Sequence, residues 1–157
     1  MKLILLVVGK TTESWAKTAI AEYESRLKHY LPFRIEVIPD LKSTKHLTEE
    51  QIKNREAEAI LAWNKPGDTM VLLDERGESY TSEGFASYLQ KKMNTGIRQL
   101  IVVIGGPYGF APSVYEAVPE RISLSKMTFS HQMVRLFAVE QCYRAMTILN
   151  NEPYHHS

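Results

Sequence analysis

The stretch Ile104-Gly105-Gly106-Pro107-Tyr108-Gly109 directly follows a continuous apolar run from Leu100 to Ile104. Such a run, bounded by glycines, is typical of a strand covered on both faces. Three more runs resemble buried strands: Lys2 to Val8, Thr69 to Asp74 and, more weakly, Arg121 to Leu124. Ligands of open parallel sheets bind beyond the carboxyl ends of the strands. The stretch therefore predicts both a fold class and the place of a site.

Helical patterns separate these strands. They run from Ser14 to Tyr30, Thr48 to Trp63, Ser82 to Met93 and His131 to Leu149. A further strand, Phe33 to Ile38, alternates between apolar and polar residues, and we expect it near a sheet edge. Alternating strands and helices predict an α/β fold with a mainly parallel sheet. The chain has 157 residues and no repeat or linker, which predicts one domain over residues 1–157.

Composition and charge narrow the class of protein. The formal net charge is +1, so no overall field attracts the chain to nucleic acid or membrane, and RNA binding would need locally gathered Lys and Arg. The apolar opening is too short for a signal peptide, and no apolar run is long enough to span a membrane. A single cysteine, Cys142, excludes an internal disulfide. We expect a cytoplasmic protein without a membrane partner.

The last helical segment is apolar on almost every side. Its polar residues leave only a narrow stripe, whereas a surface helix usually has one apolar face. Such a helix has to be buried on more than one side. The second side is either another subunit, which predicts a homodimer, or the interior of a monomer in which this helix is central.

Three loops at predicted strand ends are candidates for a ligand site. They span residues 73–77, 105–109 and 124–130. Glycines allow a ligand to approach the backbone closely, and Leu124, Met127 and Phe129 could cover a flat ring. The alternative is that Gly105-Gly106-Pro107 forms only a tight turn. Common phosphate-binding glycine motifs and serine-hydrolase motifs are absent from the sequence.

Histidines and basic residues give weaker signals. No cysteine or acidic cluster accompanies the histidines, so we expect no metal site. His131 opens a helix, while His155 and His156 lie on the tail beside Tyr154. Lys126 and Arg135 flank the third loop, where they would either contact phosphate or be ordinary solvated charges.

Taken together, these segments resemble the RlmH family, the small SPOUT-class methyltransferases that modify a pseudouridine of bacterial 23S ribosomal RNA. The resemblance covers essentially the whole chain. It depends on the following segments: Val8-Gly9-Lys10, Leu73, Ile104-Gly105-Gly106, Leu124 to Phe129 with His131, Arg135, and Pro153-Tyr154-His155.

The resemblance implies a C-terminal trefoil knot, an obligate homodimer and S-adenosyl-L-methionine as cofactor. The implied cofactor contacts are Leu73, Gly105, Leu124, Ser125, Lys126, Met127, Thr128 and Phe129. The tail of one subunit would complete the pocket of the other. The implied substrate is N3 of a pseudouridine in a stem-loop of the large RNA, recognised in the assembled ribosome.

For catalysis, His155 is the candidate general base, and Tyr154 would orient it or stack on the nucleobase. The alternative is that both only position RNA and water takes the proton. Candidate RNA contacts are Arg135, Lys126 and His156. Some relatives carry Arg or Lys where this chain has His156, and a histidine is largely neutral at pH 7, which weakens an electrostatic role there. Two other functions stay open: a non-catalytic ribosome- or RNA-binding factor, and a nucleotide-binding protein with another ligand.

Overall fold

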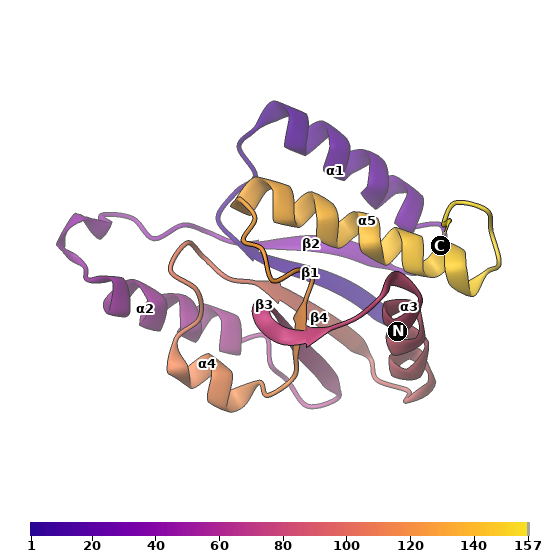
Figure 1. Cartoon of the computed structure of the whole chain (residues 1–157). Helices are drawn as coiled ribbons and strands as arrows, with labels where there is room; N and C mark the ends of the chain where they lie inside the picture. Colours follow the sequence, from indigo (N-terminus) through magenta and orange to yellow (C-terminus); the bar gives the residue numbers. More distant parts are fainter. Residues whose placement is uncertain (157) are drawn as a thin grey trace.

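The computed structural model describes residues 1–156, so Ser157, the last residue of the predicted domain, lies outside the described residues. The strands are β1 (Lys2–Val8), β2 (Phe33–Ile38), β3 (Asp68–Ser79), β4 (Gln99–Ile104) and β5 (Arg121–Ser123). The α-helices are α1 (Ser14–Leu27), α2 (Glu49–Leu61), α3 (Ser82–Asn94), α4 (Pro112–Ala117) and α5 (His131–Leu149), with a short 3-10 helix at Thr44–His46. Figure 1 shows their arrangement.

The strands form one sheet in the order β2-β1-β4-β3-β5, and every neighbouring pair is parallel. This confirms the α/β class and the five strand segments. The alternating strand β2 lies at an edge of the sheet, as its pattern predicted. The continuous apolar runs occupy β1, β4 and the first half of β3, where each strand has a neighbour on both sides.

Helices cover both faces of the sheet, which explains why those runs do not alternate. In β1, Leu3, Leu5 and Val7 point into the core beneath α1, α3 and α5. Ile4, Leu6 and Val8 point into a second core beneath α2 and α4. Figure 1 shows α5 lying beside α1 across one face of the sheet, with α2 and α4 on the other. None of the helices within residues 1–156 has the length and apolarity needed to cross a membrane.

Side-chain caps fix where several helices begin. Thr48 and Gln51 form a capping box at α2, Thr81 accepts a hydrogen bond from the Gly84 amide, and Ser130 accepts one from the Met133 amide. At its other end, α1 stops at Leu27 rather than at the predicted Tyr30. The backbone there tightens into a turn in which the Tyr30 amide donates to the Leu27 carbonyl. The short helix α4 was not predicted from the sequence.

The first predicted loop is wrong, because β3 continues through it to Ser79. The pairing of β3 with β5 shifts register between Leu73 and Glu78, so residues 74–77 form an irregular bend within a strand. Gly77 lies against the backbone of β5: a Cβ atom there would be 2.7 Å from the Arg121 carbonyl carbon and the Ile122 nitrogen. Only glycine leaves room for this approach of two backbones.

We predict that Gly77→Ala destabilises the protein by about 3 kcal/mol, because the atoms it would meet are backbone atoms that cannot rotate away. Urea unfolding measures the change. Ser79→Ala is the matched control on the same strand; its side chain is exposed, and it should change the free energy of unfolding by less than about 0.5 kcal/mol. Equal effects of the two substitutions would contradict the close approach.

Candidate functional site

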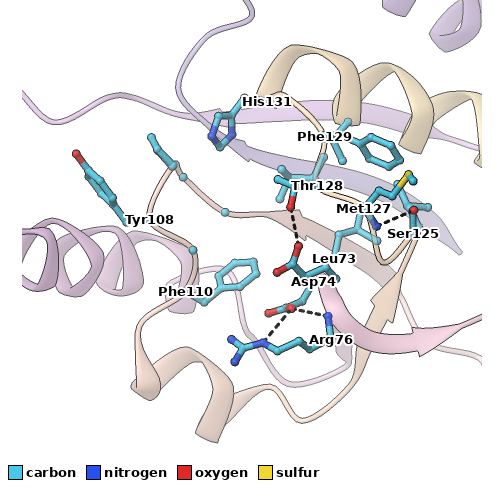
Figure 2. A pocket seen from close by; sticks show the side chains of 18 of the residues that line it. Leu73, Asp74, Arg76, Tyr108, Phe110, Ser125, Met127, Thr128, Phe129 and His131 are labelled. Carbon is cyan, nitrogen blue, oxygen red and sulfur yellow. Dashed lines mark hydrogen bonds and ion pairs between the residues drawn. The ribbon is translucent and has the colours of Figure 1, made fainter.

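A pocket of about 400 Å³ opens at the bend of β3 and the carboxyl end of β4. Figure 2 shows side chains from three separate segments around it. Its lining includes Leu73 to Arg76, Ile104 to Phe110, Tyr115, Leu124, Ser125, Met127 to Phe129, His131 and Val134. The three segments predicted from the sequence thus meet at one place. Of the implied cofactor contacts, Lys126 alone does not line the pocket; its side chain is exposed.

Gly105 and Gly106 of the second loop are required by close packing. A Cβ atom on Gly105 would lie 3.0 Å from the Phe110 ring. A Cβ atom on Gly106 would lie 2.6 Å from a carboxylate oxygen of Glu56, a residue of α2 that is only 7% exposed. The loop backbone therefore lies directly on the second core and leaves its other side to the pocket. Burial, with a smaller contribution from Asp40, raises the pKa of Glu56.

The third loop is held by its own hydrogen bonds. The Ser123 hydroxyl donates to the Ser125 carbonyl at 2.9 Å, and the Ser125 hydroxyl accepts from the Met127 amide at 3.0 Å. Phe129 packs edge-to-face on Phe137 of α5, with 5.1 Å between ring centroids. The Met127 side chain is left at the pocket mouth and is 76% exposed. An exposed apolar side chain at a pocket mouth is suited to cover a bound ring.

Two carboxylates line the pocket at the bend of β3. Glu75 accepts a hydrogen bond from the Thr128 hydroxyl at 2.9 Å, which links the first and third segments (Figure 2). Asp74 accepts from the Tyr115 hydroxyl and from the Arg76 amide. Burial opposes ionisation of Asp74, but these hydrogen bonds and the charge of Arg76 outweigh it and lower its pKa. Asp74 is therefore a fixed negative charge in the pocket wall.

The structure places Arg135 inside the protein rather than on the surface. It is 3% exposed, and its guanidinium donates to the Val8 carbonyl at 2.8 Å and to the Thr11 hydroxyl at 3.1 Å. It therefore joins α5 to the end of β1, and this burial argues against the phosphate contact expected of it. Burial, reinforced by the charge of Arg135, lowers the pKa of the neighbouring His131, so that this pocket residue is neutral at pH 7.

The tail lies at the opposite end of α5 from the pocket. His131 and Val134, at the beginning of α5, line the pocket, whereas Tyr154 and His155 follow its last turn. The tail folds back along α5, so that His155 contacts Arg144, which is 13 positions and roughly 20 Å along the helix from His131. Figure 1 shows the segment that follows α5 at the end of the molecule where β1 begins. Within one subunit, therefore, His155 and the pocket are not brought together.

At that far end, the tail packs on its own subunit. The Tyr154 ring lies 4.7 Å from the Tyr143 ring, and its hydroxyl donates to Glu140 at 2.9 Å. Burial and the hydrogen bonds with Tyr23 and Glu140 raise the pKa of Tyr154, so it stays a neutral phenol. His155 is half-buried between Arg144 and Glu83, while His156 is exposed.

Several lining residues were not expected from the sequence. Tyr115 comes from the unpredicted helix α4, Phe110 from the loop before it, and Val134 from the first turn of α5. Only the position of Phe110 and Tyr115 just after the glycine loop could have indicated them. Among residues 1–156, no group of three or more His, Cys, Asp or Glu side chains is arranged to hold a metal ion.

Comparisons with known proteins agree with this arrangement. Residues 1–155 match the family model described as predicted SPOUT methyltransferase. Over 156 residues and 99% of each chain, the protein is 59% identical to the ribosomal RNA large subunit methyltransferase H of Parabacteroides distasonis and 60% identical to that of Porphyromonas gingivalis. A solved structure of a probable methylase family protein from Haemophilus influenzae matches 99% of this chain and 70% of its own chain, with a TM-score of 0.51. The two sequences are 11% identical, so this match shows a similar fold and nothing more.

The chain is therefore a SPOUT methyltransferase. Within that class, it belongs to the family of the ribosomal RNA large subunit methyltransferase H proteins, RlmH, and the family resemblance noted in the sequence is confirmed.

We predict that Tyr115→Phe lowers the free energy of unfolding at pH 7 by about 1–2 kcal/mol, since Asp74 loses a hydrogen bond to its charged form. A carboxyl group with a lowered pKa stabilises the fold above its ordinary pKa, about 3.9, and loses that contribution as the pH falls through the folded value. The difference between variant and wild type should therefore vanish in acid. Urea unfolding at several pH values measures it.

The control for this experiment is Tyr108→Phe, because Tyr108 is 45% exposed. A loss that is the same at pH 7 and in acid would show that the Tyr115 hydroxyl acts through a contact that does not depend on ionised Asp74.

Proposed function

We propose that the protein is an S-adenosyl-L-methionine-dependent methyltransferase that methylates N3 of a pseudouridine in a stem-loop of 23S ribosomal RNA, in the assembled ribosome. The observation that carries the proposal is the meeting of the three loop segments around one pocket in a chain that belongs to the RlmH family. The relatives' name states large-subunit ribosomal RNA as their substrate.

The pocket fits the proposed cofactor in size and chemistry. About 400 Å³ is within the range of small-molecule sites. Leu73, Leu124 and Phe129 offer apolar surface to an adenine ring, and the backbone at Gly105 is open to a ligand. The carboxylates of Asp74 and Glu75 suit a ligand that carries a positively charged sulfur and an amino group. When bound, the cofactor supplies an activated methyl group.

A homodimer is part of the proposal, because the pocket and the catalytic tail lie at opposite ends of α5. The tail of one subunit would complete the pocket of its partner. Partly buried apolar side chains along α5, among them Leu136, Phe137 and Tyr143, offer a surface for the second subunit. A cytoplasmic location follows from a ribosomal substrate.

We also propose the trefoil knot. It is supported by the path of residues 124–130, which return from β5 at the sheet edge to α5 over the sheet and pass beside the glycine loop. The same path brings Thr128 against Glu75.

In the proposed reaction, the chain contributes alignment and one proton acceptor. Positioning two bound reactants can lower the activation free energy by about 7–11 kcal/mol. His155 would take the imide proton of N3, and the electron pair left on N3 would form the bond to the methyl carbon while the bond from that carbon to the cofactor's sulfur breaks and its electron pair goes to the sulfur. Tyr154, a neutral phenol, cannot act as the base at pH 7; it stacks on the nucleobase or fixes the tail. Lys126 and His156 are the exposed candidates for RNA contact.

We predict that the protein transfers labelled methyl from S-adenosyl-L-methionine to a single pseudouridine of ribosomes from cells that lack this activity. His155→Ala should lower the single-turnover rate at least about 10²-fold at unchanged ribosome affinity. If His155→Ala lowers the single-turnover rate less than about tenfold, water and not His155 accepts the N3 proton. Ribosome binding without any methyl transfer would instead favour the non-catalytic binding factor.

A mixed dimer tests whether the tail acts across subunits. His155→Ala removes the tail base, and Ser125→Trp fills the pocket, so either homodimer should be inactive. A heterodimer of the two, isolated through different tags, keeps one intact pocket facing one intact tail and should retain half of the wild-type activity. An inactive heterodimer that still binds S-adenosyl-L-methionine would show that the tail serves its own subunit.

A further inference from the structure

We infer that Glu83 is a positioning residue for His155, and that it fixes the imidazole in the tautomer whose Nδ1 atom accepts the proton. The inference rests on the proposed base role of His155 and adds a residue that the comparisons do not assign. Glu83 lies in the first turn of α3, on a different element from the tail, and 72 positions away from His155 in the sequence.

Two contacts determine the tautomer. His155 Nδ1 lies 3.1 Å from a guanidinium nitrogen of Arg144, and His155 Nε2 lies 2.8 Å from a carboxylate oxygen of Glu83. Arginine has only donors, so Nδ1 has to be the accepting nitrogen. The proton of a neutral imidazole is then on Nε2, which donates it to Glu83. The Glu83 backbone amide and the His155 hydrogen bond lower the pKa of Glu83, which keeps this acceptor ionised.

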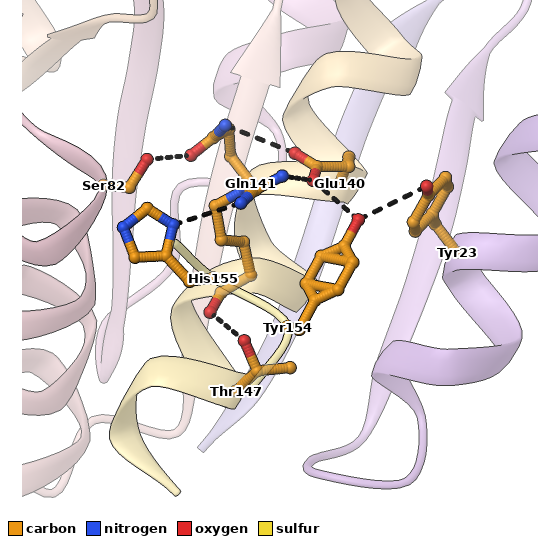
Figure 3. A network of polar contacts seen from close by, with 8 residues as sticks. Tyr23, Ser82, Glu140, Gln141, Thr147, Tyr154 and His155 are labelled. Carbon is orange, nitrogen blue, oxygen red and sulfur yellow. Dashed lines mark hydrogen bonds and ion pairs between the residues drawn. The ribbon is translucent and has the colours of Figure 1, made fainter. Parts of the chain in front are cut away.

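The groups that hold His155 are themselves fixed. Arg144 donates to Glu140 one turn earlier on α5, at 2.5 Å. Glu140 accepts from Gln141 as well as from Tyr154, and Gln141 accepts from the Ser82 hydroxyl at the start of α3 (Figure 3). A continuous polar network therefore joins α3, α5 and the tail. The imidazole orientation is set by rigid helices even though the tail has no regular structure.

The arrangement assigns separate tasks to the two nitrogens. In the state described, neither nitrogen has a free lone pair, because Arg144 donates to Nδ1 and Nε2 carries the proton. Nδ1 becomes available when the guanidinium moves off it, which Arg144 can do while keeping its ion pair with Glu140. Nδ1 then takes the N3 proton, and Glu83 stabilises the imidazolium through Nε2, as a carboxylate does for a catalytic histidine in other enzymes.

The tautomer can be read without any RNA, from the nitrogen-15 shifts of histidine-labelled full-length protein, with His155→Gln identifying the signals. We expect the Nε2–H tautomer in the wild type. Glu83→Gln keeps a carbonyl acceptor and should retain it. Glu83→Ala leaves the Arg144 guanidinium as the one contact that favours this tautomer. Because that guanidinium can move off Nδ1, Glu83→Ala should give a mixture of tautomers. Gln90→Ala is the matched control on α3, because Gln90 is exposed and its side chain bonds only to Asn94 among the residues described.

Kinetics supply the second readout. With saturating cofactor and varied ribosome concentration, Glu83→Ala should lower kcat about tenfold and leave the KM for ribosomes unchanged, with Glu83→Gln in between. An unchanged tautomer in Glu83→Ala would overturn the inference, whatever His155→Ala does to the rate. A changed tautomer with wild-type kcat in Glu83→Ala would also overturn it. The proposed role of His155 as general base is tested independently of Glu83, and it is contradicted if His155→Ala lowers the single-turnover rate less than about tenfold.

Discussion

The parallel pairing of all the strands is the constraint on which the rest of the structure depends. Because every strand runs the same way, segments that follow different strands meet at one edge of the sheet. Both faces are then covered by helices, and each strand has to supply apolar side chains alternately to two cores. The pocket lies where irregular backbone extends beyond the buried sheet, between the bend of β3 and the loops that precede α4 and α5.

Beneath that pocket edge, the protein buries ionisable groups instead of a purely apolar layer. Glu56 comes from α2 and Arg135 from α5, and both are over nine-tenths buried. Each contacts the backbone of a strand end or loop: Glu56 lies against Gly106, and Arg135 bonds to Val8. Burying such groups is costly unless they are compensated. Their position beneath the glycine loop and the end of β1 ties the helix layers to the edge at which the pocket opens.

The sequence predicted what local patterns determine, and little of what depends on distant contacts. The apolar runs and helical periodicities gave the strands and four of the five α-helices, and the glycines marked the loops around the pocket. The extension of β3 beyond Asp74 depends on pairing with β5. Residues 75–79 contain no apolar run, so the sequence pattern did not indicate a strand there. The burial of Arg135 depends on an acceptor 127 positions away, so its charge suggested a surface role. The pairing of Glu83 with His155 is equally distant, and no pattern indicates it.

The length of α5 matters in a way that loop lengths do not. A helix turns by about 100° and rises 1.5 Å with each residue. One residue inserted in α5 between Val134 and Arg144 would therefore rotate Arg144 and the tail away from Glu83 and Tyr23 while leaving the pocket end in place. An insertion in residues 40–46, which join β2 to α2, changes no such alignment. Among related proteins, differences in chain length should therefore occur mainly in the connection between β2 and α2. The number of residues in α5 should stay constant wherever the tail contributes to the site.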